Sequence, residues 1–125
     1  MRDAQAIFNA VQSAQSIVIT SHRSPDGDSI GSSMGLYHVL KKWGKDVHVV
    51  HPDPAPGFLH WVPDSDKIIH FDGQTIEASD LLEKADLIFC LDYNEPSRVG
   101  TDMQSVLVET KALKVMIDQD RKSVV

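Results

Sequence analysis

The chain has 125 residues, of which 42% are hydrophobic and 24% are charged, and its net charge at neutral pH is −6. These values are typical of one globular domain. An acidic chain lacks the broad basic surface of a duplex-DNA-binding protein, although a bound metal ion can still attract a small phosphorylated substrate. Cys90 is the single cysteine, which excludes a disulfide framework and a multi-cysteine zinc site.

The predicted elements alternate between helical and extended patterns. Apolar residues at helical spacing predict the helices, and short β-branched or apolar runs predict the strands. In chain order, we expect a helix over 3–14, a strand over 16–20, a helix over 30–40, a strand over 47–50, an irregular loop over 51–63, a short strand over 67–71, a helix over 77–84, a strand over 87–91, a weak helix over 103–110 and a strand over 113–117.

This alternation favours an α/β fold, a three-layer Rossmann-like domain with a largely parallel sheet covered by helices on both faces. Ligands of such sheets bind beyond the carboxyl ends of the strands. We find no internal repeat, low-complexity segment or second domain.

Neither a membrane span nor a targeting sequence is evident. The longest apolar run, Leu87–Leu91, is far shorter than the ~20 residues that cross a bilayer. No apolar signal-peptide core follows Met1, and Asp3 is unusual in a transit peptide. We therefore expect a soluble cytoplasmic protein.

The turn after the first strand concentrates residues that can bind metal. It contains His22, Asp26 and Asp28 on backbone that Pro25 and Gly27 bend. Two carboxylates this close repel each other without a cation between them, and mixed nitrogen and oxygen donors suit Mn²⁺, Zn²⁺, Fe²⁺ or Mg²⁺. The simpler alternative is that Asp28 or Ser29 caps the next helix and that the rest is an ordinary turn.

Two later strands also end in an aspartate. Asp92 follows the most hydrophobic strand, and Asp118 follows Ile117. The alternative for each is a turn residue that ends its strand. If the strands are parallel neighbours, however, these carboxylates approach the first turn closely enough to share two cations. Such a dimetal site binds phosphate oxygens and activates a bridging water, and the helix N-terminus beside it attracts anions.

Other residues fit no catalytic template. Cys90, His38 and His48 lie within predicted elements, where packing or structural roles are more common. We assign no role to His51, His60 or His70, and we expect Trp43 and Trp61 to pack rather than to stack on a base. The sequence has neither a phosphate-binding glycine-rich loop nor a dinucleotide fingerprint.

Residues 17–35 closely resemble the first motif of the DHH phosphoesterases, and Leu91–Gly100 is similar to the second motif of that family. Asp118 stands where the Asp-His-His motif begins. The resemblance covers essentially the whole chain and is closest to the nanoRNase/pAp phosphatase type. It implies hydrolysis of short oligoribonucleotides or 3′-phosphoadenosine 5′-phosphate (pAp), and the complete parent as a candidate homodimer. From the charge and the apolar runs described above, we expect neither duplex DNA nor a membrane as a partner.

The resemblance also implies a set of site residues. His22 and Asp26 would hold one manganese ion and Asp28 the second, with Mg²⁺ or Co²⁺ as alternative metals. Asp92 would bridge the two Mn²⁺ ions. Asp118 would orient the third motif, and Arg98 would contact the substrate or form a salt bridge.

The third motif departs from the family pattern. Gln119 and Asp120 follow Asp118 in place of two histidines, so one metal ligand and one phosphate contact of the family are missing. We therefore expect residues 1–125 to be the N-terminal part of a catalytic domain, truncated or frameshifted after Asp118, with the C-terminal substrate domain absent. Such a chain is expected to be inactive alone. Two alternatives are a degenerate metal- or nucleotide-binding module without catalytic activity and an inert fragment that folds poorly.

Overall fold

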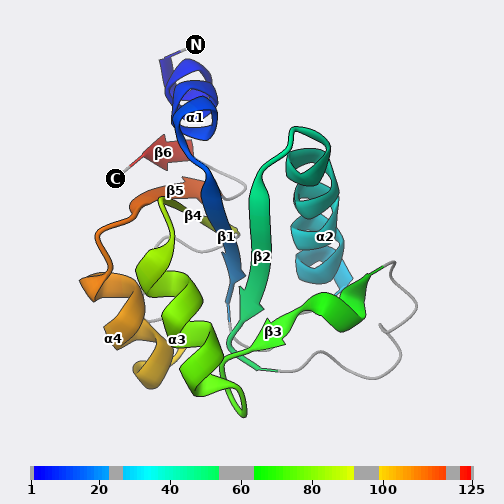
Figure 1. The fold of residues 1–125 in the computed structure, drawn as a ribbon, viewed down its shortest axis with the longest axis vertical. Coiled ribbons are helices and arrows are strands. Elements are labelled where there is room, and N and C mark those ends of the chain that lie inside the picture. The colour runs from blue at the N-terminus through cyan, green and yellow to red at the C-terminus, as the bar shows by residue number, and fades with distance from the viewer. Residues whose placement is uncertain (1, 23–26, 54–63, 92–98, 118–121, 125) are drawn as a thin grey trace.

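A computed structural model describes residues 2–22, 27–53, 64–91, 99–117 and 122–124. Strands and helices alternate along the chain (Figure 1). Their bounds are α1 Arg2–Ser13, β1 Ser16–Ser21, α2 Gly27–Lys42, β2 Asp46–His51, a 3-10 helix Ser65–Lys67, β3 Ile69–His70, α3 Thr75–Lys84, β4 Leu87–Leu91, α4 Thr101–Glu109, β5 Leu113–Ile117 and β6 Lys122–Val124.

The strands form one sheet in the order β3-β2-β1-β4-β5-β6. The pairs from β3 to β5 are all parallel, and β6 pairs with β5 in the antiparallel direction. Because these five strands run in the same direction, their carboxyl ends all lie at one edge of the sheet. The predicted α/β fold with a largely parallel sheet is confirmed.

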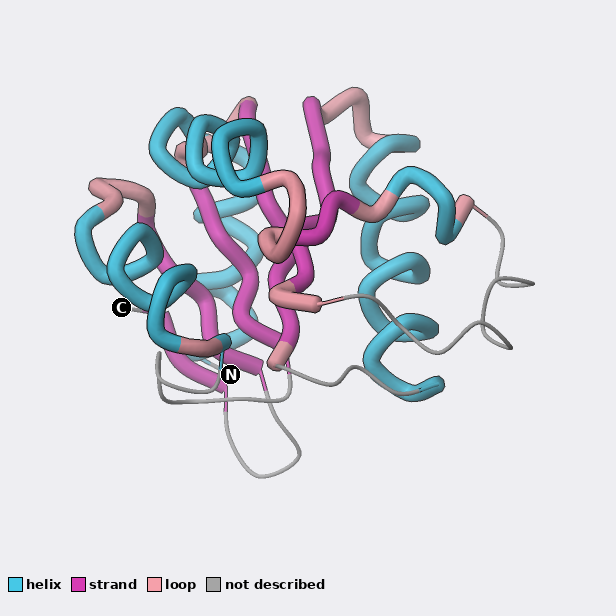
Figure 2. The backbone as a smooth tube through the Cα atoms, turned by 90° about the horizontal axis from the view of Figure 1, so that it is seen from below, coloured by secondary structure: helices cyan, strands magenta, loops and turns pink. Residues whose placement is uncertain are grey.

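Alternating side chains build a separate core on each face of the sheet. On β1, Ile17 and Ile19 pack with Ile30 and Met34 of α2. Val18, between them, faces the opposite side and joins the cluster formed by α3 and α4. Figure 2 shows the strands as a layer between α2 on one side and α3 with α4 on the other. The three-layer arrangement therefore follows from the period of two in the strand sequences.

Several predicted bounds need correction. The α2 helix begins at Gly27, earlier than expected, and β2 extends to His51, which we had placed in the loop. The predicted strand over 67–71 shrinks to Ile69–His70, because Ser65–Lys67 forms a 3-10 helix after Asp64, which has a left-handed φ of 63°. The β6 strand was not predicted, since it has three residues of which only Val124 is apolar.

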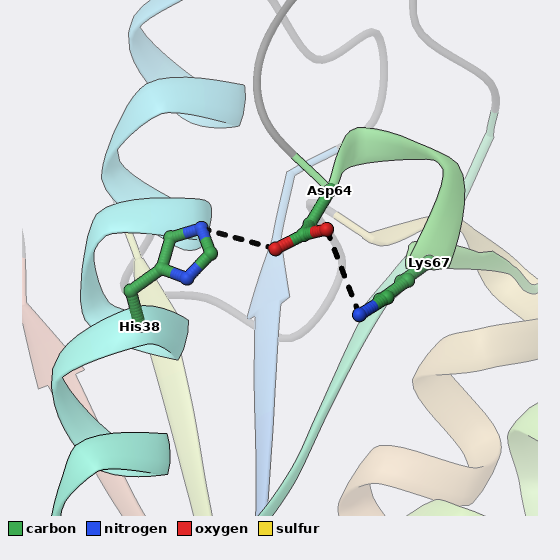
Figure 3. Close-up of polar contacts among 3 residues, drawn as sticks. All are labelled: His38, Asp64 and Lys67. Atoms are coloured by element: carbon green, nitrogen blue, oxygen red, sulfur yellow. Dashed lines mark ion pairs between the residues drawn. The ribbon is translucent and has the colours of Figure 1, made fainter.

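The side chain of Asp64 joins the segment before β3 to α2. Its carboxylate lies 3.5 Å from Nε2 of His38 and 3.5 Å from Nζ of Lys67 (Figure 3). His38 therefore has the structural role that we expected. No helix in the described part of the chain is long and apolar enough to cross a membrane.

Candidate functional site

The carboxyl ends of three strands lie in one row. Ser21 of β1 is paired in register with Leu91 of β4, and Leu91 is paired with Ile117 of β5. Neighbouring strands in a sheet are about 4.8 Å apart. The register confirms that these three strand ends lie at one edge. His22, Asp92 and Asp118 are the residues that follow them in the sequence.

The N-terminus of α2 lies at this same edge. The connection after β1 leads directly into α2, which runs back along the sheet and begins where β1 and β2 end (Figure 1). Because α2 begins at Gly27, Asp28 and Ser29 lie within its first turn and not at the preceding capping position. The side chains of both residues lie outside the described part of the structure, so the capping alternative stays untested. The free N–H groups of this first turn provide partial positive charge at the edge.

The predicted ligands are only partly described. His22 is half-buried directly after β1, and Asp28 is placed by the backbone of α2. Asp26, Asp92, Arg98 and Asp118 lie outside the described residues. Within the described ranges, no three or more His, Cys, Asp or Glu side chains are grouped to hold a metal ion. The complete ligand set therefore stays a prediction.

A buried histidine that the sequence analysis left without a role lies beside this edge. The imidazole Nε2 of His51, the last residue of β2, is 3.0 Å from Oγ of Ser33 in α2. Both residues are 0% exposed. A polar pair buried so completely is costly to break, because the remaining group then lacks a partner. The pair therefore fixes α2 against the end of β2.

His51 belongs to a group of histidines at the ends of adjacent strands. It is paired in register with His70 of β3. Burial, with smaller contributions from the charges of His70 and His22, lowers the pKa of His51 to about 3. The imidazole is therefore neutral at physiological pH. The available sequence signal was that His51 directly follows the predicted strand Val47–Val50, in which three of the four residues are valine.

The remaining sequence expectations have mixed outcomes. Cys90 is fully buried in the core, as predicted. His48 pairs with Asp46 at 3.2 Å, which supports a structural role. Trp43 was expected to pack, but it is 56% exposed at the end of α2, so that prediction was wrong. His60 and Trp61 lie outside the described residues.

The comparisons with known proteins agree on a family. The model of the DHH family, N-terminal domain, matches residues 16–123. The bifunctional oligoribonuclease and PAP phosphatase NrnA of Thermus thermophilus is 37% identical over 102 residues, which are 79% of this chain and 27% of that protein.

A solved structure has the same fold. The exopolyphosphatase-related protein from Bacteroides fragilis superposes with a TM-score of 0.91 and 40% identity, over 94% of this chain and 34% of that one. The present chain thus spans about a quarter to a third of the length of these two relatives.

Proposed function

This chain belongs to the DHH family, and from that premise we propose that the carboxyl edge of its sheet is a manganese-dependent phosphoesterase site. The observation that carries the proposal is the register of Ser21 with Leu91. It places the carboxyl ends of β1 and β4 side by side, which supports a site shared by His22 and Asp92. The N-terminus of α2 begins at the same edge and adds Asp28.

The donor set suits manganese. We assign His22 and Asp26 to one ion, Asp28 to the second, and Asp92 to both as the bridging carboxylate. One imidazole and three carboxylates offer the mixed nitrogen and hard oxygen donors that Mn²⁺ accepts, with Mg²⁺ or Co²⁺ as alternatives. The half-buried position of His22 directly after a buried strand supports this assignment, because the strand limits the positions that its imidazole can adopt.

When bound, the Mn²⁺ pair would supply positive charge to phosphate oxygens and lower the pKa of a water so that it acts as a nucleophile. The residues of the chain have separate tasks. The N–H groups at the start of α2 orient the phosphate, and Arg98 contacts a second phosphate oxygen. Asp118 orients the residues that follow β5.

Short nucleotides are the substrates we propose, within RNA degradation. The T. thermophilus relative is named for oligoribonuclease and PAP phosphatase activities, which share the hydrolysis of a phosphate ester on a small nucleotide. The net charge of −6 makes a long nucleic acid a poor substrate for a chain of this size. We therefore propose oligoribonucleotides of a few residues and pAp.

The isolated chain is a weaker catalyst under this proposal. Gln119 and Asp120 follow Asp118, and an amide and a carboxylate replace neither an imidazole metal ligand nor a phosphate contact. Groups that act together in one site lose most of the rate when one is missing. We expect the 125-residue chain to hydrolyse neither substrate at a useful rate.

A chimaera tests the proposal without the departure at Gln119 and Asp120. Residues 1–118 of this chain are joined to the part of the T. thermophilus relative that begins at the position aligned with residue 119, and release of AMP from pAp is measured with Mn²⁺. We expect metal-dependent hydrolysis that His22→Ala and Asp92→Asn each reduce at least about 100-fold. Asp46→Asn, at the opposite edge of the sheet, is the matched control. A folded chimaera without Mn²⁺-dependent hydrolysis would overturn the proposal.

A further inference from the structure

The buried contact between α2 and the end of β2 lies next to the proposed site. We propose that Ser33, His51 and Ser21 form a polar chain that sets the position of His22 relative to the first turn of α2. These three residues are positioning residues, because they act through His22 and Asp28 and not on a substrate. The inference rests on the proposed function, since it concerns the same sheet edge.

One end of the chain is the hydrogen bond between Ser33 and His51. Oγ of Ser33 and Nε2 of His51 are 3.0 Å apart, and neither residue is exposed. Ser33 lies in the second turn of α2, one turn after Asp28. The bond therefore holds the N-terminal half of α2 at a fixed height along β2.

The other end of the chain points toward β1. Nδ1 of His51 and Oγ of Ser21 are buried side-chain atoms without a hydrogen-bond partner among the described residues. Ser21 and His51 each directly follow the last register pair of β1 and β2, Thr20 and Val50, so both lie where these two adjacent strands end. By the strand alternation, Ser21 faces the same side as Ile17 and Ile19, the side that α2 covers.

The chemistry of a neutral imidazole completes the link. One ring nitrogen is a donor and the other an acceptor. If Nε2 donates to Ser33, then Nδ1 is left as the acceptor of the ring. If Ser33 donates to Nε2, then Nδ1 is left as the donor of the ring. A single buried water between Nδ1 and Oγ of Ser21 satisfies both atoms in either case.

The consequence for the site follows from the sequence neighbours. Ser21 directly precedes His22, and α2 carries Asp28 in its first turn. The chain through His51 thus connects the backbones that carry two proposed ligands of different metal ions. Residues that orient metal ligands typically change metal affinity by 10- to 100-fold when they are replaced.

Four variants separate positioning from simple packing. Ser33→Ala removes the hydroxyl with little change in volume. His51→Asn puts an amide near the position of Nδ1 but is too short to reach Ser33, whereas His51→Gln places its amide nitrogen near the position of Nε2 and retains the bond. His48→Gln, on the same strand with its side chain 37% exposed, is the matched control.

Two readouts are measured on each folded variant of the full 125-residue chain. The first is the NMR spectrum of the metal-free protein, with the imidazole signals of His22 and the amide signals of Gly27 and Asp28. The second is the dissociation constant for Mn²⁺. We expect Ser33→Ala and His51→Asn to shift these signals and to weaken Mn²⁺ binding roughly tenfold. His51→Gln keeps the bond to Ser33 but has no atom at the position of Nδ1, so it should preserve the Gly27 and Asp28 signals while shifting those of His22. His48→Gln should change neither readout.

Unchanged His22 and Asp28 signals in both Ser33→Ala and His51→Asn would overturn the inference, even if both variants lower the unfolding temperature. If only one of these two variants folds, its spectrum is compared with that of His51→Gln. Unchanged His22 and Asp28 signals in that variant would then overturn the inference. A wild-type chain that binds no Mn²⁺ would count against the proposed function, while the metal-free spectra would still decide the positioning role.

Discussion

The carboxylate of Asp86 accepts a hydrogen bond from the backbone N–H of Ser16 at 3.0 Å, although 70 residues separate them in the chain. The same oxygen accepts a second bond from the N–H of Gln15 at 3.1 Å. These two bonds lower the pKa of Asp86 below 3.8. One side chain thus ties the start of β1 to the residue that precedes β4.

Replacing Asp86 should therefore destabilise the sheet in a pH-dependent way. Asp86→Ala leaves the two N–H groups without their acceptor, so we expect a lower unfolding temperature. Because the folded pKa lies below the unfolded value of 3.8, the stabilisation is complete above that pH and is lost as the pH falls through the folded pKa. Thermal unfolding of both proteins between pH 7 and pH 3 checks this. A difference that persists undiminished at pH 3 would contradict the carboxylate's role.

His51 should make the stability of the fold depend on pH in a higher range than Asp86 does. Its pKa is 6.5 in the unfolded chain and about 3 in the fold, where burial and the nearby His70 and His22 disfavour its charge. Below pH 6.5 the unfolded state binds a proton that the folded state does not, so stability falls as the pH falls. The loss is about 1.4 kcal/mol per pH unit.

Urea unfolding at pH 7.5 and 5.5 measures this effect. We expect the wild type to lose about 1.4 kcal/mol more than His51→Gln between the two conditions, because glutamine does not titrate. His48→Gln controls for a histidine on the same strand whose ring is partly exposed. Equal losses in the wild type and His51→Gln would show that His51 is protonated in the folded state.

At Asp64, we expect the backbone conformation to affect the stability of the fold more than the ion pairs do. Its φ of 63° is left-handed, and its contacts with His38 and Lys67 are partly exposed. Exposed pairs of this kind contribute at most about 1 kcal/mol, whereas a side chain other than glycine in this conformation costs about 1 kcal/mol. We therefore expect Asp64→Gly to be about 1 kcal/mol more stable than Asp64→Ala. Chemical denaturation checks the order, and a less stable glycine variant would contradict it.

Cys90 reports whether the chain folds by itself. It is the only cysteine in the sequence and is 0% exposed in β4. In a folded chain, a thiol reagent should react only as fast as the sheet opens, and in urea it should react at once. Immediate reaction in native buffer would favour the inert-fragment alternative, because the central strand would then be accessible.

The fold could be predicted because strand and helix periods differ clearly along this chain. Leu87–Leu91 and the β-branched run after Gln15 can be buried only as inner strands, and the structure places them as neighbours. The bounds of short elements were less accurate. Ile69–His70 is too short to carry a pattern, and its pairing with His51 comes from the sheet and not from its own sequence.

The candidate site was predictable only to the level of a shared edge. The strands β4 and β5 are strongly patterned, so the arrival of their carboxyl ends at one edge could be inferred. The Ser33–His51 pair could not be predicted. It joins α2 to the end of the next strand, β2, and no motif marks that strand. Whether a polar residue is buried depends on the element that covers it. The local sequence does not show which element that is.

Binding of Mn²⁺ to the 125-residue chain tests the central claim most directly. Free Mn²⁺ is followed by electron paramagnetic resonance as protein is added, with wild type, Asp92→Asn and the control Asp46→Asn, whose side chain is exposed at the opposite edge. We predict that wild type and Asp46→Asn remove the free-ion signal at equal protein concentrations, and that Asp92→Asn needs at least about tenfold more protein. Equal binding by all three proteins, or none by wild type, would contradict a metal site at the carboxyl edge of the sheet.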